Sequence, residues 1–245
     1  MDVLYEDNHL LVINKPAGIV TMGDADKPSV HQTAVDYIRQ KYNKPGKVYL
    51  GIVSRLDALT TGVLVLARTS KAASRLVPQF GETQRTKKNS DFLPAKKIYL
   101  GVIDGALDQP SGVIENWVYK DDSSHRMRVA EQQNDITKLA RLRYITIDSI
   151  ATQSIIAVVL ETGRKHQIRL QFAELGHPIL GDHKYESRTE FPAGVALHSW
   201  QTTITHPTRR EPITFTAPLP NSWGKLHERI GSSTAIEQLV NEISE

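Results

Sequence analysis

The most constraining feature of this sequence is a succession of strand-like segments between residues 97 and 160. Five runs there are rich in β-branched, aliphatic and aromatic residues and are separated by polar or turn-forming breaks: 98–104, 113–119, 126–129, 140–148 and 154–160. Helical patterns are few and are interspersed with strands. This mixed order indicates an α+β fold around a mixed, largely antiparallel sheet with flanking helices.

Shorter strand-like runs occur on both sides of this stretch: 3–5, 10–14, 47–53, 63–67 and 195–205, the last as one long strand or a pair. Ser29 is a suitable N-cap for a helix with one apolar face, formed by Val30, Ala34, Tyr37 and Ile38. A second amphipathic helix begins at Ser70, with its inward face formed by Ala72, Ala73, Leu76, Val77 and Phe80. Further helices are predicted at 166–175, 223–230 and 234–243.

No repeat, low-complexity tract or change of composition divides the 245 residues. We therefore expect a single domain over residues 1–245, with a core of about 4–220 and a helical extension at 221–245. Segment 81–94 is polar, basic and poor in apolar residues, which is typical of a mobile loop or an insertion.

The composition excludes several classes of protein. The chain has no cysteine, so it can form neither disulfides nor thiolate metal sites. The first seven residues are acidic where a signal peptide would be basic and then apolar. No apolar run approaches the roughly 20 residues needed to cross a bilayer. These observations predict a soluble, cytoplasmic protein without a membrane partner.

Basic residues gather in clusters although the net charge is only +3 and the sequence pI is about 9.0. The clusters lie at 85–88, at 96–97, at 125–128, at Arg141 with Arg143, and at 164–166 with Arg169. If folding brings them to one face, they suit the phosphate backbone of a nucleic acid. The alternative is that each cluster belongs to a separate solvated face.

Arg55, Leu56 and Asp57 stand in a short polar loop between two strand-like runs. Loops held by rigid strands often carry chemistry. From local chemistry, the nearby Arg55 would keep Asp57 ionised, ready to act as nucleophile or base. The same residues also fit an aspartate that stabilises a turn and an arginine that is merely solvated.

Four segments, in this order, resemble the RluA family of pseudouridine synthases. They are Asn14-Lys15-Pro16-Ala17-Gly18; Arg55-Leu56-Asp57 with Thr60-Thr61-Gly62; Lys97-Ile98-Tyr99-Leu100 followed by Gly105; and residues 162–169 followed by residues 176–182. Each match is short, but together they span about residues 4–220 in the correct order.

The resemblance implies an enzyme that converts a uridine within RNA into its carbon-linked isomer after flipping the base out of the stack. It implies that Asp57 is the catalytic carboxylate, as nucleophile or base, and that Arg169, rather than Arg55, holds it ionised. Tyr99 would stack on the flipped base, and Arg55 would fill the space that the base leaves. Without the resemblance, Tyr99 also fits a core position and Arg169 an exposed one.

The resemblance further implies a central RNA-binding cleft, lined by Arg55, Leu56, Lys97, Arg164, Lys165, His166 and Gln167. The partner would be ribosomal or transfer RNA, the protein a monomer, and no metal or organic cofactor would be required. The expected protein is a stand-alone catalytic domain without the N-terminal RNA-binding extension of many relatives. The sequence departs from the family at Ser54 and Thr61, and segments 21–27 and 84–97 are where we expect substrate choice to lie.

Three alternatives follow from the same residues. His166, His177, Asp182 and His183 could suggest zinc, but their spacing fits no common zinc motif. A hydrolase of glycosidic bonds would require a second carboxyl group as acid opposite Asp57. A non-catalytic RNA-binding or RNA-folding factor could keep the scaffold, although an intact Asp57, Tyr99 and Arg169 argue against that.

Overall fold

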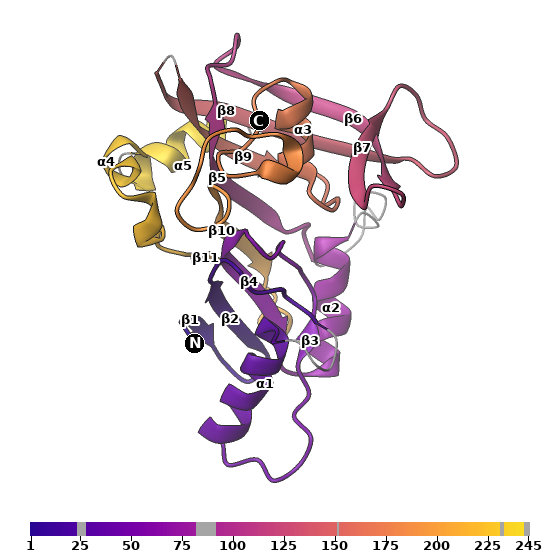
Figure 1. Cartoon of the computed structure of the whole chain (residues 1–245). Coiled ribbons are helices and arrows are strands. Elements are labelled where there is room, and N and C mark those ends of the chain that lie inside the picture. The colour runs from indigo at the N-terminus through magenta and orange to yellow at the C-terminus, as the bar shows by residue number, and fades with distance from the viewer. Residues whose placement is uncertain (24–27, 82–91, 151, 231–232, 243–245) are drawn as a thin grey trace. The chain divides into compact units, whose positions relative to one another are not determined.

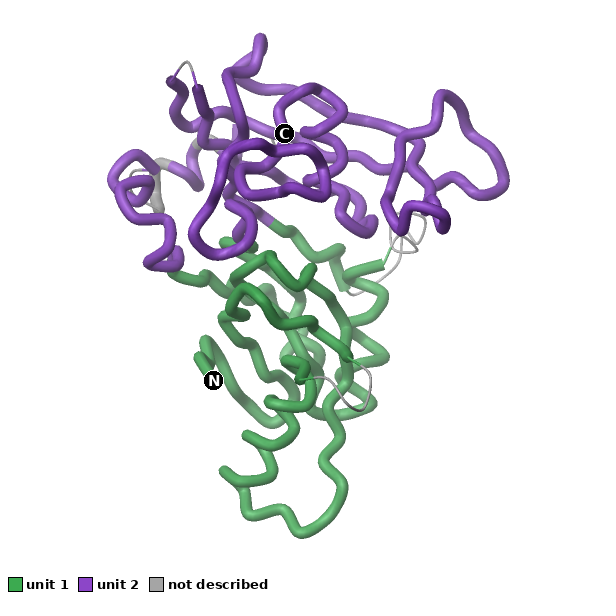
Figure 2. The backbone as a smooth tube through the Cα atoms, in the orientation of Figure 1, with its two compact units in different colours: residues 1–97, 199–218 green, residues 98–198, 219–245 purple. Residues whose placement is uncertain are grey.

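The computed structural model describes residues 1–23, 28–81, 92–150, 152–230 and 233–242. The chain forms two compact units, each built from two separate chain segments (Figures 1 and 2). Unit 1 comprises Met1–Lys97 and Ser199–Pro218, and unit 2 comprises Ile98–His198 and Leu219–Glu245. The chain therefore leaves unit 1, forms most of unit 2, returns to unit 1 and ends in unit 2.

Unit 1 is built on strands β1 (Val3–Glu6), β2 (Leu10–Lys15) and β4 (Thr61–Ala67), followed by β10 (Leu197–Thr205, in unit 1 from Ser199) and β11 (Pro212–Thr216). The strand order is β1-β2-β4-β10-β11, and the two-residue β3 (Gly51–Ile52) also pairs with β4. The β2–β4 pair is antiparallel, with Leu10 opposite Ala67 and Lys15 opposite Gly62. This register brings the end of β2 beside the start of β4.

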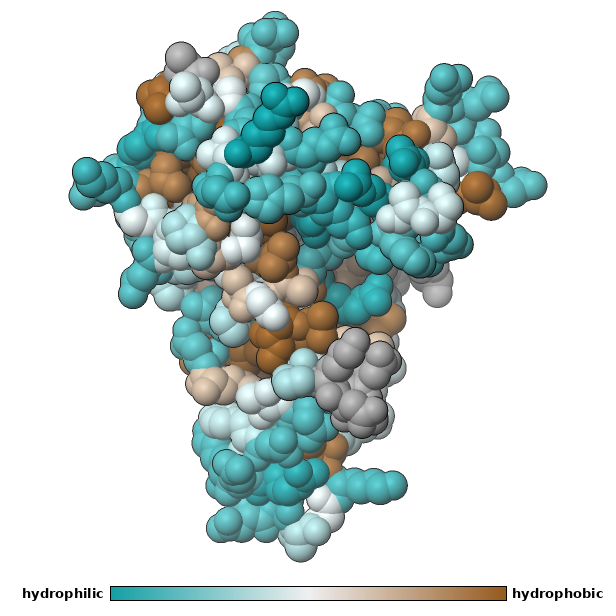
Figure 3. Space-filling view, in the orientation of Figure 1, coloured by the Kyte–Doolittle hydropathy of each residue, from teal (hydrophilic) through white to brown (hydrophobic). Residues whose placement is uncertain are grey.

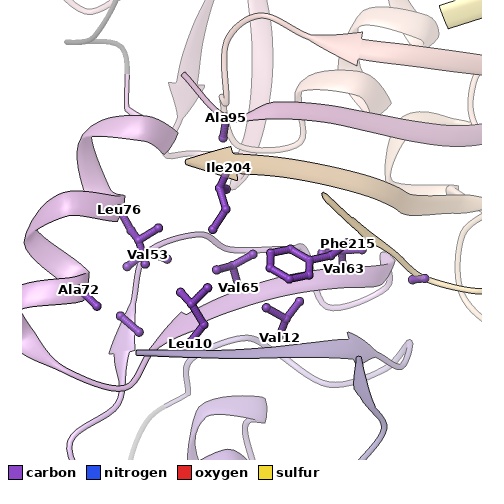
Figure 4. Packing of buried hydrophobic residues seen from close by; sticks show 12 residues of the cluster. Leu10, Val12, Val53, Val63, Val65, Ala72, Leu76, Ala95, Ile204 and Phe215 are labelled. Carbon is purple, nitrogen blue, oxygen red and sulfur yellow. The ribbon is translucent and has the colours of Figure 1, made fainter. Parts of the chain in front are cut away.

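Two helices cover opposite faces of this sheet, α1 (Val30–Lys41) and α2 (Ser70–Phe80). Leu64 and Leu66 of β4 pack in the cluster that contains α1, whereas Val63 and Val65 pack in the cluster that contains α2 (Figure 4). Alternate strand residues point to opposite faces. β4 is therefore buried on both faces, which explains its uninterrupted apolar sequence.

Side-chain caps begin both helices. The hydroxyl of Ser29 accepts a hydrogen bond from the Gln32 amide, as predicted, and Thr69 caps α2 through the Ala72 amide. One predicted inward residue of α2 is wrong. Val77 is 52% exposed, because it lies beyond the edge of the apolar face that Ala72 and Leu76 bury.

Unit 2 contains a five-stranded antiparallel arrangement in the order β5-β9-β8-β6-β7. The strands are β5 (Lys96–Asp104, in unit 2 from Ile98), β6 (Ser111–Asp121), β7 (Arg126–Ala130), β8 (Lys138–Ile150) and β9 (Gln153–Leu160). Helix α3 (Gln167–Glu174) packs on β6, β7 and β8 through a buried cluster of Val118, Met127, Ala140, Leu170 and Tyr185.

The remaining elements of unit 2 are short. They are the 3₁₀ turns η2 (His183–Tyr185) and η3 (Asn221–Trp223) and the helices α4 (Leu226–Ile230) and α5 (Ser233–Glu242). Helix α5 packs against β8 and β9. Among the residues that the structure describes, no helix is long and apolar enough to span a membrane.

The α+β fold with a largely antiparallel sheet and flanking helices is confirmed. The predicted strand at 47–53 is wrong for most of its length, since only Gly51–Ile52 pairs with β4. Strand β11 was not predicted, because its five residues include only two large apolar side chains, Ile213 and Phe215. Most of segment 81–94 lies outside the described residues, and one catalytic domain over 1–245 remains a prediction.

Candidate active site

The Arg55–Thr60 loop of unit 1 connects β3 to β4 without regular secondary structure, as predicted. Its turn is closed by the Thr60 amide, which donates to the Asp57 carbonyl at 3.1 Å. Asp57 is partly buried, whereas Arg55 is exposed. A fixed backbone therefore presents Asp57 beside two paired strands.

Lys15, the last residue of β2, holds this loop from beneath. Its side chain is fully buried, and its Nζ donates to the carbonyl oxygens of Pro16, Ala58 and Thr60 at 2.8, 2.9 and 2.9 Å. Burial lowers the pKa of Lys15 to about 8, and the negative charge of Asp57 opposes that shift. The first and second sequence motifs therefore form one hydrogen-bonded structure.

Two further residues of the N-terminal segment bind the same loop. The Gly18 amide donates to the Ala58 carbonyl at 2.9 Å. The Thr21 hydroxyl donates to the Leu56 carbonyl at 2.8 Å and accepts from the Leu56 amide at 3.1 Å. Because both backbone groups of Leu56 are bound, the residue before Asp57 has little freedom to move.

Gly62, the second residue of β4, has a backbone conformation that requires glycine. Its φ is +106°, and a Cβ there would lie 2.2 Å from the backbone oxygen of Ser199. The close approach of β4, which carries Gly62, to β10, which carries Ser199, explains why the Thr60-Thr61-Gly62 motif ends in glycine.

Arg55 does not pair with Asp57. Among the described residues, its exposed guanidinium makes no hydrogen bond or ion pair. The expectation from local chemistry is therefore wrong: spacing of two residues in an extended loop does not bring the side chains together. The predicted role of Arg55 in filling the space of a flipped base remains a prediction.

Unit 2 carries the other two predicted catalytic residues. Tyr99 lies on β5 opposite Val158 of β9 and is buried. Arg169 lies on α3 and is 4% exposed, so an exposed position for it is wrong. Its Nε and Nη2 donate to the two carboxylate oxygens of Asp182 at 2.6 and 2.8 Å, a bidentate pair.

An aromatic ring completes the surroundings of Arg169. The guanidinium carbon lies 5.3 Å from the centre of the Tyr185 ring. The Tyr185 hydroxyl lies 2.9 Å from Nδ1 of His166 and accepts from the Met127 amide at 3.3 Å. These contacts orient the Arg169 side chain from two sides.

The residues that precede Arg169 have mixed positions. Gln167 is buried, and its amide binds Thr162, the Arg164 backbone and the Arg141 carbonyl. This placement favours a role in the fold for Gln167. Lys165 is exposed, whereas Arg164 is partly buried and donates to the Leu139 carbonyl at 2.7 Å.

Comparison with known proteins identifies the family. Residues 9–174, more than half of the chain, match the family model described as RNA pseudouridylate synthase. The chain belongs to this family. The matched range contains all three residues predicted to be catalytic, namely Asp57, Tyr99 and Arg169.

Individual synthases align with most of the chain. The chain is 33% identical over 240 residues to the ribosomal large subunit pseudouridine synthase D of Nitrosomonas europaea, covering 94% of the chain but only 65% of that protein. It is 33% identical over 221 residues to an uncharacterized RNA pseudouridine synthase, YhcT, of Bacillus subtilis, covering 90% of the chain and 69% of that protein. It is 29% identical over 225 residues to the dual-specificity RNA pseudouridine synthase RluA of Haemophilus influenzae, covering 89% and 92%.

A solved structure supports the fold. The human RNA pseudouridylate synthase domain containing 4 superposes with a TM-score of 0.74 at 21% identity, covering 94% of this chain and 92% of that one. The α+β fold described here is thus the fold of a pseudouridine synthase.

The four residues considered for zinc point to different partners. Asp182 binds Arg169, His166 binds the Tyr185 hydroxyl, and Nδ1 of His177 and of His183 lie beside the carbonyls of Asp104 and Ser187. The described part of the chain contains no group of side chains suited to a metal ion. Both carboxylate oxygens of Asp182 accept hydrogen bonds from Arg169.

Sequence reasoning missed the roles of Lys15, Asp182 and Tyr185. Lysine is rarely fully buried, so a lysine at the end of a strand is normally expected to be exposed to solvent. Its one available signal was its position at the end of an apolar run, directly before Pro16. Asp182 and Tyr185 follow a glycine-containing loop, and nothing local indicates that they reach α3.

Proposed function

We propose that this protein is an RNA pseudouridine synthase that isomerises uridine within RNA. The observation that carries the proposal is the Arg55–Thr60 loop, which the Asn14–Gly18 motif holds through Lys15 and Gly18 and to which Thr21 also binds. A carboxylate on a rigid, bound backbone meets the geometric demand of catalysis on one particular base. The family match supports the same reaction.

The reaction rearranges bonds without an added group. The bond between the ribose and N1 of uracil breaks, a bond between the same ribose carbon and C5 forms, C5 loses a proton and N1 gains one. Asp57 acts as the nucleophile or base that begins this exchange. Tyr99 stacks on the flipped base and assists proton transfer.

Arg169 is the cation that holds Asp57 ionised, and its pairing with Asp182 and Tyr185 supports a fixed orientation for that role. Arg55 fills the space left by the flipped base. Leu56, Lys97, Arg164, Lys165, His166 and Gln167 complete the proposed RNA-binding set. Because the reaction is an internal rearrangement, no cofactor takes part in it.

The proposed substrate is ribosomal or transfer RNA. One relative is named for the large ribosomal subunit, and another is named as having dual specificity. We further propose that the enzyme works as a cytoplasmic monomer. Mapping of pseudouridine in total RNA from cells with and without the gene would identify the substrate by the site that disappears.

A variant series tests the function directly. Purified protein would be incubated with unmodified ribosomal and transfer RNA transcripts, and pseudouridine would be mapped by chemical derivatisation. We expect Asp57→Ala to abolish product and retain RNA binding, while Asp36→Ala, which removes a carboxylate whose side chain is 42% exposed, retains activity. Full activity of Asp57→Ala would overturn the mechanism. Release of free uracil would instead indicate a hydrolase, and binding without product in the wild type a non-catalytic factor.

A further inference from the structure

The hydroxyl of Tyr185 joins three segments of unit 2 that are far apart in the sequence. It belongs to η2, lies 2.9 Å from Nδ1 of His166 before α3, and accepts from the Met127 amide of β7 at 3.3 Å. Tyr185 is buried, so this junction is shielded from solvent. A single buried atom thus fixes where the three segments meet.

The residue directly before each of these three positions is a cation. Lys184 precedes Tyr185, Lys165 precedes His166, and Arg126 precedes Met127. Nζ of Lys184 donates to the carbonyl of His125 at 2.7 Å, which adds a second link between η2 and the β6–β7 turn. The junction therefore gathers three positive charges on one part of unit 2.

These charges have little local compensation. Asp182 is committed to Arg169, and Glu186 lies 3.9 Å from Arg126 with a side chain that is 87% exposed. Lys165 is exposed, and the Arg126 side chain is 38% exposed. Burial, and then the positive charges of Lys165, Arg169 and Arg126, lower the pKa of Lys184, which shows that the cations are close enough to repel.

We propose that Arg126, Lys165 and Lys184 form a patch that binds backbone phosphates of the substrate RNA. Three neighbouring cations carry more positive charge than the exposed Glu186 offsets, a polyanion stabilises such an excess, and each phosphate contact releases counterions. Hydrophilic residues predominate over unit 2 on the face in Figure 3, which suits a wet, charged interface. The proposal rests on the proposed function. Arg126 belongs to the basic cluster 125–128 noted in the sequence, whereas Lys184 was not predicted to bind RNA and lies beyond the matched residues 9–174.

The salt dependence of RNA binding tests the patch. The affinity for a fluorescein-labelled RNA stem-loop would be measured over a range of salt concentrations for the wild type and for R126Q/K165Q/K184Q. We expect the variant to bind at least tenfold more weakly and its slope of log affinity against log salt to be shallower by about 2, from three lost phosphate contacts. The control K44Q/K71Q/K225Q removes the same charge from exposed lysines elsewhere and should keep the wild-type slope.

A charge-neutral variant tests the junction itself. Tyr185→Phe keeps the ring beside Arg169 but removes the shared hydroxyl, so we expect severalfold weaker RNA binding with no change in net charge. Wild-type binding by Tyr185→Phe would refute the role of the junction, and equal slopes for the patch and control variants would refute the patch. Both measurements concern binding only. Failure of the wild type to form pseudouridine would therefore count against the proposed function and not against the patch.

Discussion

Asp182 and Arg169 form a buried bidentate ion pair, with guanidinium–carboxylate distances of 2.6 and 2.8 Å and almost no exposure of either side chain. Removing one partner of such a pair leaves a charge without compensation in the interior. This single contact connects α3 to the loop that precedes η2, and it sets the orientation of a residue that we propose to be catalytic.

We expect Asp182→Asn to lower the free energy of unfolding by about 3–5 kcal/mol, because it leaves the Arg169 cation buried without its counter-ion. Urea unfolding followed by circular dichroism would measure the loss. Asp36→Asn is the matched control, since it breaks an exposed aspartate–arginine pair with Arg39 at 2.6 Å and should cost less than about 1 kcal/mol. Equal losses in the two variants would contradict the structural role of Asp182.

We expect Lys15→Met to destabilise unit 1 by about 3 kcal/mol and to abolish activity. Methionine fills a similar volume, but it leaves the carbonyl oxygens of Pro16, Ala58 and Thr60 without their shared donor. Hydrogen exchange of the Thr60 amide should accelerate, which would show that the loop has loosened. The control Lys44→Met changes an exposed lysine and should alter neither property. An unchanged exchange rate of the Thr60 amide would refute the role of the Lys15 hydrogen bonds in holding the loop.

Alanine substitutions at two glycines would distinguish the cost of backbone strain from the cost of a steric clash. Gly18 and Gly62 both have positive φ, +85° and +106°, but a Cβ at Gly18 meets open space whereas one at Gly62 lies 2.2 Å from the Ser199 oxygen. We expect Gly18→Ala to cost roughly 1–2 kcal/mol, from the left-handed conformation alone. Gly62→Ala should cost about 2 kcal/mol more, measured by urea unfolding. Equal costs would mean that β4 and β10 can separate without penalty.

The lowered pKa of Asp7 predicts that the free energy of unfolding decreases at acidic pH. Burial raises its pKa, but hydrogen bonds from the His9 and Leu10 amides, His206 and Tyr5 outweigh this effect and hold the pKa at about 2. Because the folded pKa lies below the ordinary value of 3.8, the contribution is complete above about pH 4 and is lost as the pH falls toward 2.

We therefore expect Asp7→Asn to cost about 2 kcal/mol of stability at about pH 5 and much less near pH 2. Urea unfolding at the two pH values would show the difference. The exposed Asp135→Asn should show no such change. A cost of Asp7→Asn that does not depend on pH would contradict the depressed pKa.

The sequence predicted those parts of the fold whose determinants are local. The apolar runs of β2 and β4 and the Ser29 cap of α1 each act within a few residues, and their elements were correctly placed. Strands β11 and β3 pair with β10 and β4, which are their neighbours in the chain, yet pattern alone misjudged both. β11 has only two large apolar side chains, and only two residues of the predicted β3 segment pair with a neighbour.

In the candidate site, the parts encoded by contiguous residues were predicted and the parts that depend on tertiary contacts were not. Asp57 and its loop were found because their motif is contiguous. The support given by Lys15, Asp182 and Tyr185 depends on tertiary contacts, which convert residues that are normally exposed or unremarkable into buried structural elements. A charged side chain becomes interpretable as a core residue only once its partners are known.

The two-segment composition of unit 1 has a consequence for synthesis on the ribosome. Ile204, Phe215 and Ala217 complete the cluster over β2, β4 and α2, yet they emerge about 100 residues after Lys97. At elongation rates of about 5–20 residues per second, translation of these residues takes roughly 5–20 s. During that time the apolar face of β2, β4 and α2 lacks these three side chains. The segment of unit 1 that carries the Arg55–Thr60 loop is thus synthesised before the residues that cover its sheet, and its core can be completed only after residues 98–198 have been translated.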